Sequence, residues 1–370
     1  MNEVLFKQSE VNNPYEQYAQ QQASHPVYWD AQNKVWGIYT YKGCWLLLNS
    51  PHTRIPALAA PAEGVLNEYA VLLLQHLVRL GNGAQHSHAR QIVMQLHKGM
   101  QPVSTALLLD QLLARHHVTT IDWVTISKQL PAYHLLNSFR FPQENIQAIL
   151  CCIERLVTIM SPHKTTEQVT AINTAAQQVY QLTEQQLLSG MAGAVAPDQL
   201  VISTVNLVGL LIQSYDAGRG ILCNALLQAF TRSTTTGHRE AMKKLVVETL
   251  RYDSPIHNTR RVLTSNMVIH NRELKEGDTV VLVLAAANRD PAQFEHPELF
   301  DTNRHNNNTH LTFGAGAHAC VAQHSAVAMA TEALVYLFHQ YPEVRLLMEQ
   351  VSYEPLVNAR LPQQLLIALK

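Results

Sequence analysis

A cysteine near the carboxyl-terminal end of the chain lies in a pattern that suits a metal ligand. Cys320 closes the segment Phe313–Cys320, which we expect to open the last long helix, from about His318 to Tyr341. At a helix N-terminus, the dipole and the unpaired backbone N–H groups lower the pKa of a thiol and favour the thiolate, the form that binds metals. The two glycines of this segment let backbone pack closely against a flat ligand. The pattern therefore predicts that Cys320 is a metal ligand.

The other four cysteines fit an ordinary structural role. The five cysteines are scattered along the chain, odd in number and without a C-x-x-C pair. Such spacing is typical neither of a disulfide framework nor of a zinc site, and it favours a reducing compartment. A cysteine without such a context usually behaves as a small buried hydrophobe. We expect this of Cys44, Cys151, Cys152 and Cys223.

Several other segments accompany the cysteine segment in a fixed order. One is Glu248-Thr-Leu-Arg251, whose spacing puts a carboxylate and a guanidinium on one face of a helix. Together with the cysteine segment, F-G-x-G-x-H-x-C, the set resembles the cytochrome P450 family, the haem-thiolate oxidases. The resemblance covers essentially the whole chain and is weakest over about 51–81 and 100–195. The remaining segments are Asn13-Pro14-Tyr15, Pro26-Val27 and Ala287-Asn288-Arg289-Asp290-Pro291 with Phe294, Pro297 and Phe300-Asp301.

The resemblance implies a haem b cofactor and most of its protein contacts. Cys320 is implied as the proximal thiolate on the iron, whose electron donation favours O–O cleavage. Glu248 and Arg251 are implied as a structural pair that braces this side of the haem. Cationic partners for the propionates are implied in three places, and at one of them Arg260 competes with Arg261. The implied haem contacts are His86, Arg90, Arg261, Phe313, Gly314, His318 and Cys320.

Two positions depart from the family pattern. The family usually has glycine two residues after the cysteine, where this chain has Ala322, whose methyl group we expect to be tolerated. The long helix of the family carries A-G-x-[DE]-T over the iron, and there the acid and the threonine relay protons to dioxygen. Aligning Asn224-Ala225-Leu226 with the N-A-L of the family puts Asp216 at the acid and Ala217 at the threonine. A register shifted by one turn, with Ile221 at the threonine position, restores no alcohol either.

The elements that must position these residues are mainly helical. Apolar residues recur at three- and four-residue spacing from about Leu66 to Lys244. The stretch from Pro197 to Arg232 is apolar on nearly every face and far longer than the mean helix of about 11–12 residues, so we expect it to run through the core. The glycines and the charge at 213–220 weaken it. Helix breaks are expected at 81–83, Pro102, Pro131, 161–162 and Pro197.

Strands are expected only near the two ends of the chain. A short helix is followed by two predicted strands, WGIYTYKG (36–43) and CWLLLNSP (44–51), and a hairpin is predicted around Glu276-Gly277-Asp278. No internal repeat or linker is visible. The sequence therefore predicts a mainly α fold with a minor β region, in one catalytic domain over 1–370, and the resemblance implies a P450-like fold with a long core helix over the haem.

Composition excludes several classes of partner. Lys plus Arg is 27 and Asp plus Glu is 28, which gives a net charge of −1 and removes the electrostatic case for a nucleic-acid or anionic-membrane partner. The N-terminus lacks the basic and apolar regions of a signal peptide, and the longest apolar run, Val280–Ala287, is far below the roughly 20 residues that span a bilayer. We therefore expect a soluble, cytoplasmic protein.

The resemblance implies a haem-thiolate monooxygenase that uses dioxygen and two externally supplied electrons on a small, largely apolar molecule, in specialised metabolism. No G-x-G-x-x-G follows a strand, so a soluble ferredoxin or flavodoxin with its reductase is the implied electron source. Because the relay alcohol is missing at Ala217, two readings stay open. Either water or a substrate hydroxyl replaces it, or the enzyme does peroxide-driven, dehydrating or radical-coupling chemistry. A non-catalytic haem protein, or a recruiting partner in a biosynthetic assembly, is the alternative outside the enzyme class.

Overall fold

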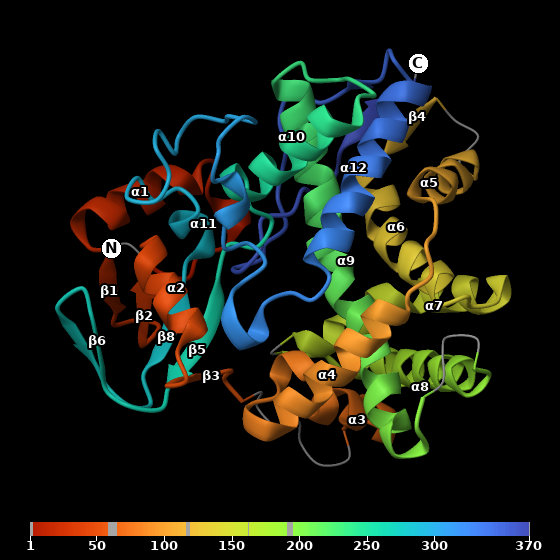
Figure 1. Cartoon of the computed structure of the whole chain (residues 1–370), viewed down its shortest axis with the longest axis horizontal. Helices are drawn as coiled ribbons and strands as arrows, with labels where there is room; N and C mark the ends of the chain where they lie inside the picture. The colour runs from red at the N-terminus through yellow and green to blue at the C-terminus, as the bar shows by residue number, and fades with distance from the viewer. Residues whose placement is uncertain (1–2, 58–64, 116–118, 162, 191–194, 370) are drawn as a thin grey trace. The chain divides into compact units, whose positions relative to one another are not determined.

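The computed structural model describes residues 3–57, 65–115, 119–161, 163–190 and 195–369 (Figure 1). The chain forms two compact units, and each is built from separate stretches of sequence. The first unit comprises Met1–Pro56, Leu113–Ser127 and Ala217–Lys370, and the second comprises Ala57–Leu112 and Lys128–Asp216. One catalytic domain over 1–370 stays a prediction.

The first unit contains the helices at both ends of the chain. Asn13 caps helix α1 by accepting a hydrogen bond from the backbone N–H of Tyr15, and Pro14 occupies the first helical position, where its missing N–H costs nothing. Helices α10 and α12 pack against each other. The helices of this unit are α1 (Pro14–Ser24), α2 (Tyr41–Asn49), α10 (Arg239–Tyr252), α11 (Leu284–Ala287) and α12 (Gln323–Gln340), with the 3-10 turns η1 (Gln8–Glu10), η5 (Asn307–Thr309) and η6 (Gly316–His318).

All described strands lie in the first unit. The main sheet has the order β1-β2-β8-β5-β3, in which β2 and β8 pair in parallel and the other neighbours are antiparallel. Its inner face supplies Ile38, Val280 and Leu282 to a core shared with Leu47 of α2. The strands are β1 (Val27–Asp30), β2 (Val35–Ile38), β3 (Thr53–Arg54), β5 (Thr259–Leu263) and β8 (Thr279–Leu282) in this sheet; β4 (Thr120–Asp122), β9 (Arg345–Leu346) and β10 (Leu366–Ala368) in a second; and β6 (Met267–Ile269) with β7 (Arg272–Leu274) in a third.

The described part of the second unit is helical. Helix α8 packs against α7 and α3, and it starts with a capping box in which Thr165 and Gln168 each bond to the backbone N–H of the other. The elements that lie in this unit are α3 (Glu68–His76), η2 (Val78–Leu80), α4 (Gly83–Gly99), α7 (Gln143–Val157), η3 (Thr158–Met160), α8 (Thr166–Leu188) and η4 (Pro197–Gln199). The helices that cross the boundary between the units are α5 (Thr105–Ala114), α6 (Trp123–Ser138) and α9 (Leu200–Thr231).

Helix α9 is the long core helix expected from the sequence, with 32 residues and an unbroken helical backbone. The interruption expected at 213–220 is absent. Gly220 is needed for packing, because a Cβ atom there would lie 2.4 Å from the side chain of Pro255. The buried Arg219 is paired with Glu354 at 2.7 Å, so its charge is not isolated in the core.

Two local predictions are wrong. The segment CWLLLNSP is not a strand but most of helix α2, because its buried residues, Cys44, Leu47 and Leu48, recur at helical spacing and Thr40 caps the helix by accepting from the N–H of Gly43. Pro131 is not a helix break, since it lies inside α6. A short apolar run and a lone proline are both weak local signals, and tertiary packing overrides them.

The predicted hairpin also needs correction. A turn does occur at Gly277, whose φ of +87° suits glycine, but it joins β7 to β8, which are not paired. The hairpin is formed by β6 and β7 around His270 and Asn271, both in the left-handed region with φ of 47° and 61°. Asparagine tolerates this conformation, which two-residue hairpin turns require. Strand β8 instead joins the main sheet between β2 and β5.

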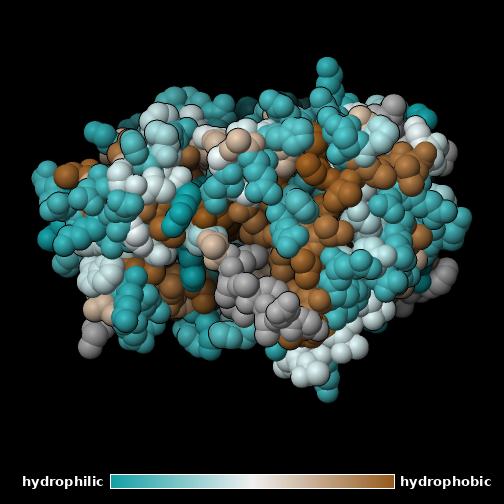
Figure 2. All heavy atoms as spheres, turned by 90° about the horizontal axis from the view of Figure 1, so that it is seen from below, coloured by the Kyte–Doolittle hydropathy of each residue, from teal (hydrophilic) through white to brown (hydrophobic). Residues whose placement is uncertain are grey.

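The surface is mixed rather than uniformly charged. Figure 2 shows one face, on which hydrophobic side chains gather in patches between hydrophilic ones. Large apolar side chains that reach the surface include Trp45 on α2, which is half exposed, and Val268 on β6. Among the described residues one helical stretch, Pro197–Thr231, is long and apolar enough to cross a membrane, and just over half of its most apolar window is buried, as expected of a core helix.

Candidate functional site

Cys320 lies on an exposed loop whose path is fixed by two glycines. Gly314 and Gly316 have φ of +68° and +66°, a conformation that other residues rarely adopt. At Gly316 a Cβ atom would also lie 2.5 Å from the carbonyl oxygen of Leu48 in α2, so only glycine fits there. The backbone N–H of Cys320 donates to the carbonyl of Phe313 at 2.9 Å and closes the loop. The loop therefore presents an exposed thiol from a fixed backbone.

The expectation that the last helix begins near His318 is wrong. Residues 316–318 form the separate 3-10 turn η6, and helix α12 begins at Gln323, three residues after Cys320. Between the two elements Ala319 has φ of −57° and ψ of 143°, which is not helical, so the chain cannot run as one helix from His318 into α12. The thiol thus precedes the helix rather than lying in its first turn.

A buried polar network ties the loop to the body of the first unit. Asn288 accepts a hydrogen bond from the N–H of Leu311 at 2.6 Å and donates to the hydroxyl of Thr312 at 2.8 Å. Thr312 in turn donates to the carbonyl of Leu250 at the end of α10, at 2.6 Å. Buried polar groups that all find partners specify one arrangement of the chain. Asn288, from the A-N-R-D-P segment, is therefore the link between the cysteine loop and α10.

The predicted pair on α10 is formed and fully buried. Arg251 and Glu248 lie 2.6 Å apart, and neither side chain has any solvent exposure. Arg251 also donates to the carbonyl oxygens of Asn288, Pro297 and Leu299, at 2.9–3.1 Å. The backbone thus satisfies the guanidinium donors that the carboxylate leaves over, and this lowers the cost of burying the pair. The pair holds the 288–299 segment in place.

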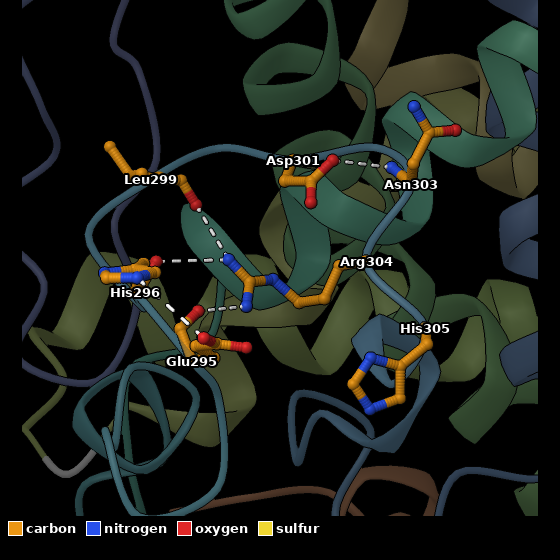
Figure 3. A pocket seen from close by; sticks show the side chains of 7 residues that line it. All are labelled: Glu295, His296, Leu299, Asp301, Asn303, Arg304 and His305. Atoms are coloured by element: carbon orange, nitrogen blue, oxygen red, sulfur yellow. Dashed lines mark hydrogen bonds and ion pairs between the residues drawn. The ribbon is translucent and has the colours of Figure 1, made fainter.

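Arg304 is a third member of this cluster that the sequence did not reveal. Its Nε lies 3.5 Å from the Glu248 carboxylate, and its guanidinium donates to the carbonyls of Glu295, His296 and Leu299. Figure 3 shows the bonds from Arg304 to the three carbonyls, at a pocket of about 240 Å³. The sequence offered one hint of this role, because Arg304 is the one Lys or Arg between Pro291 and Phe313. The pocket is lined by Glu295, His296, Leu299, Asp301, Asn303, Arg304 and His305.

Two adjacent arginines compete for the implied propionate contact, and the structure separates them. Arg261 on β5 is buried, whereas Arg260 is exposed. Among the described residues Arg261 forms no ion pair, and its recorded bonds go to the Thr259 hydroxyl and the Arg260 carbonyl. Burial without a carboxylate lowers the pKa of Arg261 to about 10. A buried cation of this kind favours an anionic ligand. His318 is half-buried in η6, and its role stays a prediction.

The other cysteines are poorly suited to bind a metal. Cys44 and Cys223 are completely buried, and burial raises the pKa of Cys223 to about 12 and that of Cys44 further. The pKa of Cys152 is also raised by burial. Cys151 is exposed but lies within helix α7, without a glycine loop. Since the thiolate is the metal-binding form, Cys320 is the best candidate.

The implied contacts His86 and Arg90 lie in the second unit, on the first two turns of helix α4. His86 is buried rather than on a solvated face, and burial, with the neighbouring Arg90 charge, lowers its pKa. Both residues belong to a different unit from Cys320. Their contact with the cofactor therefore stays a prediction.

Helix α9 opens to solvent at one place in its middle. Every residue is buried over 203–212 and over 218–227, whereas Gln213, Ser214, Asp216 and Ala217 are half-buried. At about 100° per residue these four positions share one face about 160° wide. We call these four residues the α9 window. It contains both predicted catalytic positions, Asp216 and Ala217, whose roles stay predictions.

The first unit combines features that fit haem b. A lone thiol donor suits a metal that brings its other ligands with it, and in the described part of the chain no three His, Cys, Asp or Glu side chains are grouped to hold a metal ion. The buried Arg261 suits an anionic group. Two apolar residues of the loop itself, Phe313 and Ala315, are half-buried. The donor chemistry therefore agrees with the cofactor that the resemblance implied.

Comparison with known proteins gives one consistent answer. The family model described as Cytochrome P450 matches residues 230–347, which include Glu248, Arg251 and Cys320. A Bacillus subtilis (strain 168) protein that carries the name cytochrome P450 YjiB is 23% identical, with 94% of this chain and 91% of that protein covered. The biotin biosynthesis cytochrome P450 of the same strain is 38% identical over 120 residues, which are 32% of this chain and 30% of that protein.

Solved structures show the same fold along nearly the whole chain. P450BioI in complex with an acyl carrier protein ligated to hexadec-9Z-enoic acid superposes with a TM-score of 0.80 at 21% identity, covering 96% of this chain and 98% of that one. CYP109E1 from Bacillus megaterium in complex with testosterone gives 0.78 at 20% identity, covering 97% and 99%. The Tepidiphilus thermophilus P450 heme domain gives 0.82 at 19% identity, covering 98% and 95%.

Proposed function

The chain belongs to the cytochrome P450 family as a haem b-dependent monooxygenase of bacterial type, and on that premise we propose that it oxidises a small, largely apolar organic molecule in specialised metabolism. When bound, the haem would catalyse the oxidation of the substrate by dioxygen. This reaction consumes two electrons and two protons and releases one water molecule. The observation that carries the proposal is the exposed Cys320 thiol, on a glycine loop tied by Asn288 to the buried Glu248–Arg251 pair. The protein supplies the thiolate, a dry pocket and protons.

We assign the protein groups as follows. Cys320 holds the iron, and the Phe313–Cys320 loop positions it. Arg261 and His318 hold propionates from the first unit, and His86 with Arg90 does so from α4. The α9 window delivers protons to dioxygen, with Asp216 as the acid. Burial of Arg261 without a carboxylate and the polar residues in the middle of a core helix support these roles.

The electrons come from a redox partner, and we propose a soluble ferredoxin or flavodoxin in the cytoplasm. A net charge of −1 gives the protein no strong global field, so an acidic partner must dock on a local basic patch. Reduction by ferredoxin should therefore slow as salt rises, because surface charges more than about 8 Å apart are screened at 0.15 M salt. A reduction rate independent of ionic strength would exclude such a partner.

A second candidate reaction follows from the missing alcohol at position 217. Without a threonine there, the enzyme is also suited to peroxide-driven, dehydrating or radical-coupling chemistry on the same scaffold. Turnover with dioxygen and an electron donor, compared with turnover on peroxide alone, separates the two reactions. If haem binds but neither dioxygen with an electron donor nor peroxide supports turnover, the result would indicate a non-catalytic haem protein.

The ligation test compares two exposed cysteines. Reduced protein with carbon monoxide should show the red-shifted Soret band of thiolate-bound haem, and Cys320→Ser should lose it. Cys151→Ser is the matched control, because it also removes an exposed thiol but leaves the glycine loop unchanged. A Cys320→Ser protein that keeps the band would refute the assignment.

Substrate class can be narrowed by spectral titration. Entry of an apolar molecule next to the iron changes the Soret absorption, so free fatty acids, steroids and acyl chains on a carrier protein form a sensible panel. Two structural neighbours were solved with a carrier-bound acyl chain and with testosterone. Mass spectrometry of molecules that co-purify with the protein is the independent check.

A further inference from the structure

We propose that Tyr18 is a redox-active tyrosine whose phenolic proton passes to His257 when the ring is oxidised. The pair takes up oxidising equivalents that reach the haem when no substrate is there to consume them. The inference goes beyond the proposed function but rests on it, because the oxidant is the haem after its reaction with a peroxide. It starts from two buried titratable side chains to which none of the assigned roles gives a task.

The two side chains form a hydrogen-bonded acid and base inside the first unit. Tyr18 lies on α1 and His257 lies just before β5, and both are buried. The phenol oxygen is 2.9 Å from Nδ1 of His257, and the side-chain amide of Gln8 donates to the same oxygen at 3.4 Å. Because Gln8 brings its own proton to the phenol oxygen, the phenol proton points to His257.

The protonation states of the pair suit oxidation coupled to proton transfer. Burial, with the charges of Arg360 and Arg289, lowers the pKa of His257 to about 3, and burial raises the pKa of Tyr18. At neutral pH the phenol therefore keeps its proton and the imidazole is an uncharged base. A phenol that loses an electron becomes a strong acid, so a base in direct contact takes its proton in the same step. The two arginines disfavour the resulting imidazolium, so only a strong oxidant drives the reaction.

The neighbouring tyrosines are less suited to this role. The rings of Tyr15 and Tyr39 lie 6.0 and 6.4 Å from that of Tyr18, measured between their centres. Tyr15 donates to the Asp253 carboxylate, but the guanidinium of Arg289 lies 3.7 Å from the centre of its ring, and a cation there opposes removal of an electron. For the hydroxyl of Tyr39, the described part of the chain offers no hydrogen-bonded base. Oxidation is therefore easiest at Tyr18.

The pair also lies near a residue that is proposed to hold the haem. His257 precedes Arg261, the proposed propionate partner, by four residues, so at most about 14 Å separates their Cα atoms. Both residues belong to the first unit, as Tyr18 does. Electrons tunnel through protein over distances of this order, so the pair can be oxidised without touching the haem.

The proposed step balances. Tyr18 loses one electron to the oxidised haem and one proton to His257, which leaves a neutral tyrosyl radical and an imidazolium. The redox partner returns the electron, and the imidazolium returns the proton to the phenol oxygen. Two such cycles, with two electrons from the redox partner and two protons from solvent, convert one hydrogen peroxide into two water molecules. Both side chains are unchanged at the end.

Electron paramagnetic resonance detects the radical directly. Oxidised holoenzyme that is mixed with peroxide without substrate and then rapidly frozen should show a tyrosyl radical, and Tyr18→Phe should lose it. His257→Gln should lose it as well, because glutamine still accepts a hydrogen bond but is too weak a base to take the proton. Tyr39→Phe is the matched control, because it removes the hydroxyl of another buried tyrosine next to Tyr18, and it should keep the signal.

Bleaching of the haem gives the second measurement. Under excess peroxide the Soret absorption should fade faster in Tyr18→Phe than in the wild type or in Tyr39→Phe. A radical of undiminished yield in Tyr18→Phe overturns the inference, as does an equal loss in Tyr39→Phe or a wild type that has the thiolate Soret band but forms no tyrosyl radical. If Tyr18→Phe does not fold, His257→Gln decides by the same signal. A wild type without the thiolate Soret band would instead refute the proposed function.

Discussion

The cysteine loop and the α9 window illustrate opposite uses of polar groups inside a protein. Around the loop, Asn288 and Thr312 bond to one another and to backbone, and Arg251 is surrounded by Glu248 and three carbonyls. In the window, Gln213 and Ser214 donate to carbonyl oxygens of their own helix and are half-buried. The first arrangement fixes geometry, and the second leaves groups available for chemistry.

The difference suggests where sequence change is tolerated. A network in which each member depends on the next loses several interactions when one residue changes. A substitution at a half-buried helix position outside such a network costs little stability, so the side chain there can be adapted to a substrate. This accounts for a chain that keeps the cysteine segment and the Glu248–Arg251 pair but has alanine at position 217. The predictions below test the contrast through the free energy of unfolding, from the largest expected change to the smallest.

The largest effect is expected from breaking the buried pair. Arg251→Met leaves the Glu248 carboxylate buried with the more distant Arg304 charge and the backbone N–H of Asp301, and it removes the bonds to three carbonyls. We expect the free energy of unfolding to fall by about 3–5 kcal/mol, as measured by urea unfolding, and haem content to fall with it.

The control for this prediction is an exposed pair. Arg239 and Glu332 are 3.2 Å apart, with the Arg239 side chain largely exposed, so Arg239→Ala should cost less than about 1 kcal/mol. Equal losses in Arg251→Met and Arg239→Ala would mean that burial of the pair contributes nothing.

Acid should destabilise the first unit through buried histidines. Burial, with the charges of Arg360 and Arg289, lowers the pKa of His257 to about 3, and burial with the charge of Arg251 lowers the pKa of His310 to about 4. Unfolded, both would titrate near 6.5. Stability should therefore be intact above pH 6.5 and fall as the pH drops from 6.5 toward 4, by about 1.4 kcal/mol per pH unit for each histidine.

Urea unfolding between pH 7 and pH 4.5 measures this slope. His257→Gln removes one titrating group and should flatten the slope by about half, because His310 still contributes. An unchanged slope in that variant would mean that His257 does not stay neutral in the folded protein. The variant also loses the 2.9 Å hydrogen bond between the Tyr18 hydroxyl and Nδ1 of His257, which lowers stability at all pH values and does not change the slope.

The framework was largely predictable because it depends on local patterns. Three features can be read from single continuous stretches of the sequence. They are the length and hydrophobicity of α9, the three-residue spacing of Glu248 and Arg251, and the glycines before Cys320. The mainly α fold with a minor β region was predicted from such patterns and is confirmed, and the family and the haem b cofactor that the resemblance implied agree with the comparisons. The roles of the individual site residues remain predictions.

What sequence reasoning missed depends on contacts between distant segments. Helix α2 was read as a strand because Cys44–Pro51 is too short for its period to be decisive. The place of β8 in the sheet depends on pairing with β2, more than 240 residues earlier. Arg304 was missed because only folding brings it to Glu248. The sequence marked 213–220 as a polar interruption of the long helix, but which of these residues are half-buried depends on what packs against them.

A smaller loss than that from Arg251→Met is expected at Gly316. Gly316→Ala places a residue in the left-handed region, which costs about 1–2 kcal/mol, and also drives a methyl group into the Leu48 carbonyl, which adds about 1–3 kcal/mol. Gly277→Ala is the matched control, because its φ is also positive but nothing lies within 4 Å of the added carbon. If the two variants unfold at the same urea concentration, the contact between α2 and the cysteine loop is not rigid.

The smallest change in stability, with a large change in chemistry, is expected in the window. Asp216→Asn alters a half-buried side chain and should change the free energy of unfolding by less than about 0.5 kcal/mol. If water or a substrate hydroxyl completes proton delivery, this variant should form less product per NAD(P)H and release more peroxide, since general-acid catalysis is worth about 10²–10⁴-fold. Ala217→Thr should then be tolerated or improve that ratio. In a peroxide-driven or non-hydroxylating enzyme, Ala217→Thr should bring no gain, and Asp216→Asn should affect KM more than kcat. A variant at Asp216 with unchanged rate and unchanged product yield would remove this residue from the catalytic assignment, and the α9 window would then differ from the cysteine loop in burial but not in chemical role.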